Sequence, residues 1–68
     1  MKGVSGRRIV ALAQSRGWVL VKMRGSHAKL RNPITGEGAI VPVHANRDLR
    51  PGMQRRLMRD FRLTDADL

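Results

Sequence analysis

His27 is the residue of this sequence that is best suited to acid–base chemistry. It follows Gly25-Ser26, a dipeptide typical of a turn, and it begins an alternating segment in which Lys29 and Arg31 fall on its own side. Histidine ordinarily changes its charge near neutral pH, and Lys and Arg bind phosphate. This spacing predicts one titratable base among phosphate-binding cations, which is what RNA cleavage through the 2′-hydroxyl requires.

The sequence leaves other roles open for these residues. His27 could instead donate a hydrogen bond to phosphate or to the backbone, or be an exposed loop residue. Gly25 could let RNA approach the backbone closely, or could simply be required by a tight turn. Ser26 could orient a phosphate, although capping of the turn is the favoured interpretation.

His44 is the second of the two histidines. An acid–base pair of His44 with His27 would be chemically attractive, but we favour a structural role. In that role His44 and Asn46 hold down the connection into the last helix. The chain has no Cys, and two His alone cannot complete a structural zinc site, which usually has four ligands. We therefore expect no metal and no other cofactor.

The charge of the chain points to a polyanionic partner. Fourteen Lys or Arg against five Asp or Glu leave 68 residues with a net charge of +9. Such an excess attracts nucleic acid through counterion release. The longest apolar run, Ile9–Ala13, has five residues, whereas a membrane span needs about 20 and the core of a signal peptide about 7–15. We therefore expect RNA as partner, no membrane and a cytoplasmic protein.

Hydrophobic spacing predicts two helices. The first should begin after Ser5, whose hydroxyl can cap it, and stop near Gly17. The second should begin at Pro51, which suits the first helical turn. Its apolar stripe consists of Met53, Leu57, Met58 and Phe61, and its opposite face of Arg55, Arg56, Arg59 and Arg62. That arginine face could be solvated charge, a second RNA contact or a surface for an acidic partner.

Three strands are predicted between the helices, over Trp18–Arg24, His27–Arg31 and Gly38–Val43. Short turns between consecutive strands favour an antiparallel meander. The predicted fold class is α+β in the order α-β-β-β-α, with a three-stranded antiparallel sheet covered by two helices and a single domain over residues 1–68. Because strand residues alternate in facing, we do not expect Lys22, Arg24, Lys29 and Arg31 all to hold phosphate at once.

Trp18 and Phe61 are the only Trp, Tyr or Phe residues, and both occupy apolar positions. We expect both in the core. Proteins that bind single strands usually stack bases on several aromatic residues, so recognition here is expected to rest on phosphate and shape. The C-terminal residues Asp65–Leu68 are expected to be frayed.

Several short motifs follow one another along the chain in a fixed order. They are Gly17-Trp18, Gly25-Ser26-His27, Val41–Asn46 and Leu49–Gly52. Together they resemble the HicA toxin family of bacterial HicAB toxin–antitoxin systems, from Ser5 to about Thr64. Met53 stands where many members have Thr, and Phe61-Arg62 where many have a small residue followed by Gly.

The resemblance implies a fold similar to the double-stranded-RNA-binding domain and a bacterial endoribonuclease that cleaves messenger RNA to arrest translation. It implies that His27 is catalytic and that a HicB-type antitoxin silences the toxin. We expect metal-independent cleavage, with RNA bound by Lys22, Arg24, Gly25, Ser26, Lys29 and Arg31. The first alternative is a non-catalytic RNA-binding module, in which His27 would be replaceable. A DNA-binding protein ranks third.

Overall fold

The computed structural model describes residues 1–68. In chain order it contains α1 (Gly6–Ser15), β1 (Val19–Arg24), β2 (His27–Arg31), β3 (Gly38–Pro42), α2 (Pro51–Asp60) and a short 3₁₀ helix (Asp65–Asp67). The strands form one antiparallel sheet in the order β1-β2-β3. The predicted α+β fold class and α-β-β-β-α order are therefore confirmed. None of the helices has the length and apolar character that a membrane crossing demands.

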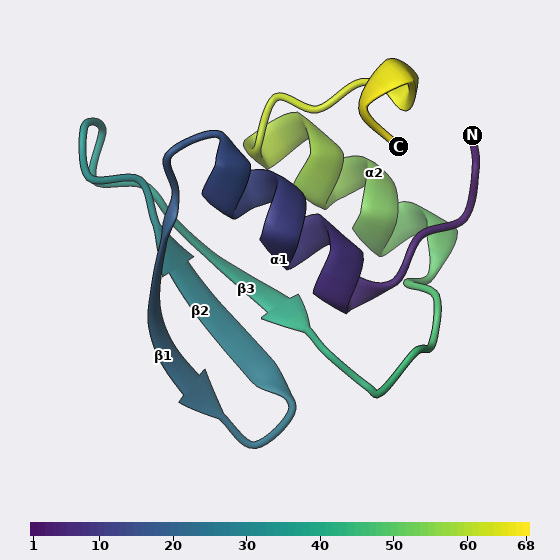
Figure 1. The fold of residues 1–68 in the computed structure, drawn as a ribbon, viewed down its shortest axis with the longest axis horizontal. Coiled ribbons are helices and arrows are strands. Elements are labelled where there is room, and N and C mark those ends of the chain that lie inside the picture. The colour runs from purple at the N-terminus through teal and green to yellow at the C-terminus, as the bar shows by residue number, and fades with distance from the viewer.

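Both helices lie on the same face of the sheet, and both contact β3 (Figure 1). Beneath them the sheet contributes Ala28, Leu30 and Val41 to a core of 13 buried apolar residues. Trp18 and Phe61 belong to this core, as predicted, and their rings meet edge to face with centroids 4.7 Å apart. β1 forms the far edge of the sheet, where all six of its residues are exposed.

The predicted element boundaries are close to those observed. The Ser5 hydroxyl accepts a hydrogen bond from the Arg8 backbone N–H at 3.1 Å, so it caps α1 as expected. Gly17 follows the helix at a φ of 94°, in the left-handed region that glycine tolerates best. β1 begins at Val19, one residue later than predicted. β3 ends at Pro42, one residue earlier than predicted, and Pro42 has no N–H to continue the ladder.

Gly6 sits where α1 begins and where the helix approaches β3 most closely. A Cβ atom at this position would overlap the backbone carbonyl oxygen of Pro42 and would press on the Val41 side chain. Only glycine allows the helix to lie this close to the strand. The contact therefore sets the distance between α1 and the end of β3.

Gln54 is a buried polar residue of α2 that the apolar stripe did not predict. Its side-chain oxygen accepts from the Val4 N–H at 3.2 Å, and its side-chain nitrogen donates to the Lys2 carbonyl at 2.6 Å. The amide therefore satisfies two backbone groups of the segment that leads into α1. This arrangement ties α2 to the N-terminal segment without an unpaired buried group.

α2 ends at Asp60, two residues before Arg62, the last residue of the predicted arginine face. The Leu63 N–H donates to the Met58 carbonyl at 2.7 Å, and the Arg62 N–H donates to the Arg59 carbonyl at 3.1 Å. This pair of bonds is a Schellman motif, in which the residue at the position of Arg62 is left-handed. Arg62 has a φ of 56°, and it stands where many members of the family that the sequence resembles have Gly. Its guanidinium lies 3.7 Å from the Glu37 carboxylate.

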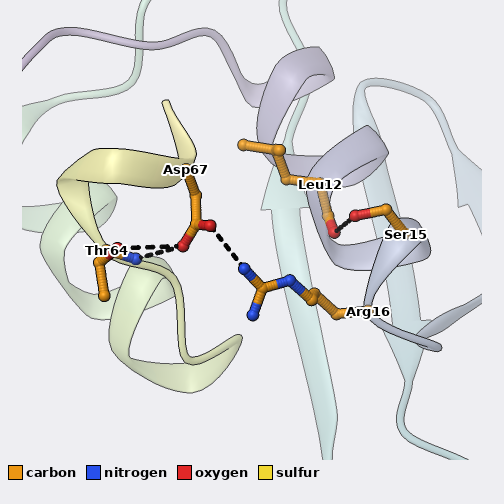
Figure 2. Close-up of polar contacts among 5 residues, drawn as sticks. All are labelled: Leu12, Ser15, Arg16, Thr64 and Asp67. Carbon is orange, nitrogen blue, oxygen red and sulfur yellow. Dashed lines mark hydrogen bonds and ion pairs between the residues drawn. The ribbon is translucent and has the colours of Figure 1, made fainter.

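The C-terminal segment is ordered, so the prediction of a frayed end is wrong (Figure 2). Asp67 accepts from the Thr64 N–H at 2.7 Å and pairs with the Arg16 guanidinium at 2.5 Å. The Thr64 hydrogen bond, assisted by the Arg16 charge, holds the pKa of the Asp67 carboxyl below its usual value. Arg16 is the residue after α1, so this ion pair joins the C-terminal segment to the end of α1, and Leu68 packs against the core.

Replacing Gly6 with Ala is expected to lower the free energy of unfolding by about 1–3 kcal/mol, the usual cost of forcing atoms into a packed site. Gly52→Ala is the matched control, because a Cβ at Gly52 meets nothing within 4 Å. We expect it to stay within about 1 kcal/mol of the wild type. Urea unfolding of both variants measures the difference, and a Gly6→Ala protein as stable as the wild type would contradict the close approach.

Arg62→Gly should raise the free energy of unfolding by about 0.5–1 kcal/mol. The change relieves the left-handed strain but gives the unfolded chain more freedom, which offsets part of the gain. Both variants lose the contact with Glu37. Arg62→Ala keeps the left-handed strain as well, so its free energy of unfolding should not rise above that of the wild type. Thermal melts of both variants test this difference. Equal stability of the Gly and Ala variants is the outcome that contradicts it.

Candidate active site

His27 and its neighbouring cations lie on the face of the sheet that the helices leave open. On β2, His27, Lys29 and Arg31 are exposed and alternate with the buried Ala28 and Leu30. Residues directly opposite each other on neighbouring strands share a face. β1 places Arg24 opposite His27 and Lys22 opposite Lys29, so both β1 cations point to the side of His27.

The two-residue turn between β1 and β2 produces this arrangement. Gly25 and Ser26 separate the paired residues Arg24 and His27, and the regular pairing from there places Lys22 opposite Lys29. Farther from the turn β1 has a β-bulge, in which Leu20 pairs with the buried Leu30 and Val21 is the extra residue. The bulge turns Leu20, rather than Val21, toward the face of Leu30, and it leaves the facing of Lys22 and Arg24 unchanged. The premise that the four cations cannot share a face is wrong, because the turn pairs the cations of β1 with residues of β2 on the side of His27. That all four cations do not hold phosphate at once stays a prediction.

His27 borders an open hollow whose lining is almost entirely cationic. The lining residues are Lys22, Arg24, His27, Lys29 and Ile40, with no acidic side chain among them. Arg31 lies outside this hollow, at the other end of β2 opposite Val19 and Gly38. The structure therefore brings three of the four predicted cations together around His27. All five lining residues are exposed.

Gly25 and Ser26 form the turn between β1 and β2, and His27 is the first residue of β2. Gly25 has a φ of 57° and open space around it, so the turn conformation itself calls for glycine. The Ser26 hydroxyl makes no hydrogen bond within the chain, so the favoured capping role is wrong. Its carbonyl instead accepts from the Val43 N–H at 2.6 Å. Both residues are exposed or half-buried beside His27.

The structure places His44 directly beside His27. The ring centroids are 6.4 Å apart and the rings are inclined at 78°. The side chains of His44 and Asn46 make no hydrogen bond within the chain, so the predicted role in holding down the loop is wrong. The backbone holds the loop instead, through the Arg47 N–H to the His44 carbonyl at 2.9 Å and the Leu49 N–H to the Val4 carbonyl at 2.8 Å.

Three further arginines lie near this site and were not predicted as site residues. Arg56 of α2 lines a second hollow together with His27 and Asp60, whose carboxylate lies 4.0 Å away from Arg56. Arg47 and Arg50 line a third hollow together with His44. Helical spacing had placed Arg56 on the arginine face of the second helix, but not beside His27. For Arg47 and Arg50 the only sequence signal is the overall positive charge, because no periodic spacing links a loop to a distant strand.

The arginine face predicted for the second helix is divided by the fold. Arg56 lies in the hollow that includes His27. Arg55 and Arg59 line a separate hollow with Met1 and Leu63. Only one side of α2 can therefore belong to the same surface as His27. No three His, Asp or Glu side chains are grouped so that they could hold a metal ion.

Comparison with known proteins identifies the family of this chain. No curated protein and no solved structure matches it. A family model described as the HicA toxin of bacterial toxin–antitoxin systems matches residues 6–63, which include both helices, the whole sheet and the two histidines. Because this match covers most of the sequence, the chain belongs to the HicA toxin family.

Proposed function

We propose that this HicA-family toxin is a metal-independent endoribonuclease in which His27 acts as general base. HicA toxins are known as ribonucleases, and the family match includes every residue around the histidine. The observation that supports the proposal most directly is the hollow on the open sheet face. It combines one imidazole with Lys22, Arg24 and Lys29 and contains no carboxylate. The three cations suit the binding of a phosphodiester, and the imidazole beside them can accept a proton.

In the proposed reaction, the neutral imidazole of His27 takes the proton of a ribose 2′-hydroxyl. The 2′-oxygen attacks the adjacent phosphorus, and the bond from phosphorus to the 5′-oxygen breaks. The products are a 2′,3′-cyclic phosphate and a 5′-hydroxyl end. Lys22, Arg24 and Lys29 stabilise the charge that grows on the non-bridging oxygens. A positioned base contributes typically 10²–10⁴-fold to the rate.

RNA recognition in this proposal rests on phosphate contacts. Trp18 and Phe61, the only large aromatic side chains, are buried and cannot stack on bases. Arg31 extends the cationic row along β2, and the turn at Gly25 and Ser26 borders the site. The substrate is messenger RNA or related RNA, and its cleavage arrests translation in the bacterial cytoplasm.

Membership in a toxin–antitoxin family implies an antitoxin partner. We propose a HicB-type antitoxin that neutralises the toxin. A net charge of +9 on the toxin favours an acidic partner. A non-catalytic RNA-binding module is the alternative function, since an open cationic sheet face would serve it equally well. His27 separates the two functions, because only the nuclease needs its imidazole.

The first test is RNA cleavage by the wild type and by His27→Ala, both in excess EDTA. Loss of the base should lower the cleavage rate by about 10²–10⁴-fold. The wild-type product should carry 2′,3′-cyclic phosphate ends. Arg55→Gln, on the side of α2 away from His27, is the control and should cleave normally. A strict magnesium requirement that survives loss of His27 would falsify the mechanism, and equal RNA binding without cleavage by either protein would favour the binding module.

The second test measures how the affinity for RNA depends on salt. A fully 2′-O-methylated oligonucleotide cannot be cleaved through its 2′-position, so its binding can be followed by fluorescence anisotropy. Lys29→Gln should weaken binding and reduce the salt slope by about 0.7, the value for one phosphate contact with a single strand. Arg55→Gln should leave the slope unchanged. If both variants lose affinity equally, the cationic hollow is not the RNA-binding surface.

A further inference from the structure

His44 has a chemically capable side chain that the fold does not use. It is exposed, and its imidazole forms neither a hydrogen bond nor an ion pair with the chain. The next residue, Ala45, is held at a φ of 49°. This left-handed conformation is strained for a residue that has a Cβ atom. Backbone strain of this kind concentrates at functional sites.

A single hydrogen bond brings His44 to His27. The Val43 N–H donates to the Ser26 carbonyl at 2.6 Å, beyond the last paired residue of β3. Each histidine is the residue that follows one partner of this bond. Their ring centroids are therefore only 6.4 Å apart, although the two residues belong to different strands and loops. Both side chains open to the same solvent-exposed surface.

We propose that His44 is the general acid of the reaction and protonates the 5′-oxygen as it leaves phosphorus. This assignment rests on the proposed nuclease function. His27 takes a proton from the 2′-hydroxyl, the bond from the 2′-oxygen to phosphorus forms, and the bond from phosphorus to the 5′-oxygen breaks. The leaving oxygen takes a proton from protonated His44. Exchange with water then returns His27 to its neutral form and His44 to its protonated form.

The distance between the two imidazole rings suits a base and an acid that act on the same phosphodiester. An acid or base must come within about 2.6–3.2 Å of its oxygen. The attacking 2′-oxygen and the leaving 5′-oxygen lie on opposite sides of one phosphorus, so the acid and the base must lie on either side of that phosphorus. His27 alone cannot serve both oxygens in the same step, because its imidazole gains a proton on the side of the attack. The observed centroid separation of 6.4 Å lets one phosphodiester lie over both rings.

The hollows around the two rings are rich in cations. His27 shares one with Lys22, Arg24 and Lys29 and another with Arg56 and Asp60, whereas His44 shares its hollow with Arg47, Asp48 and Arg50. Pro42 and Met53 line both the hollow of His44 and the one shared by His27 and Arg56, so these two hollows adjoin each other. A phosphodiester placed over both histidines therefore has cations on each side.

The decisive experiment changes the leaving group. We would compare an RNA oligonucleotide with one whose scissile 5′-oxygen is replaced by sulfur, because a thiolate leaves without being protonated. His44→Ala should cleave ordinary RNA about 10²–10⁴-fold more slowly than the wild type and should cleave the sulfur-containing RNA almost as fast as the wild type. His27→Ala should fail on both substrates. Equal impairment of His44→Ala on both substrates, or none on ordinary RNA, would overturn the assignment.

A pH series provides a second readout that a structural role would not affect. The wild-type rate should rise with pH as the base loses its proton and fall again as the acid loses its own. His44→Ala and His44→Gln should both lose the falling limb and keep the rising one. Retention of the falling limb in both variants would contradict the proposal. The surrounding Lys, Arg, Asp48 and Asp60 remain in every variant and cannot account for a change confined to one limb.

The controls separate this proposal from the function on which it rests. Asn46→Ala alters the same loop at an exposed side chain without hydrogen bonds, and it should melt and cleave as the wild type does. Wild-type protein that cleaves neither substrate would overturn the nuclease function itself. Wild-type cleavage that both His44 variants reproduce would overturn only the assignment of the acid.

Discussion

Burial of a single face of the sheet is the constraint on which the rest of this structure depends. A chain of 68 residues has enough apolar side chains for one core, and both helices are used to cover the side of Ala28, Leu30 and Val41. The opposite face has no packing to satisfy. It can therefore hold His27 and several cations in water, without the cost of burying a charge.

The same constraint explains why the open face is electrostatically strained. Lys22 lies directly opposite Lys29, and Arg24 lies one pair further toward the turn on the same face. Like charges in cross-strand positions destabilise a sheet. A bound anion would relieve this repulsion. The turn at Gly25 and Ser26, which fixes the register of β1 against β2, is the local feature that concentrates these charges on one face.

The end of β3 links the packing of the core to the chemistry of the site. Gly6 allows α1 to approach Pro42, and the adjacent Val43 N–H reaches the Ser26 carbonyl. The strand end is therefore held against α1 on one side and against the β1–β2 turn on the other. His44 follows this anchored segment, so its backbone has a defined position, and its ring lies 6.4 Å from that of His27.

Features that depend on local backbone preferences could be predicted from the amino-acid sequence. These are the cap at Ser5, the stop at Gly17, the alternation of β2, the helix start at Pro51 and the placement of His27 after a turn. Four other features could not, namely the bulge at Val21, the neighbouring position of His44, the buried bonds of Gln54 and the ordered end at Asp67. Each of these joins segments that are distant in the chain or depends on which face is buried. Local spacing contains no information about such partners, because strand register and helix packing are settled only when the whole core closes.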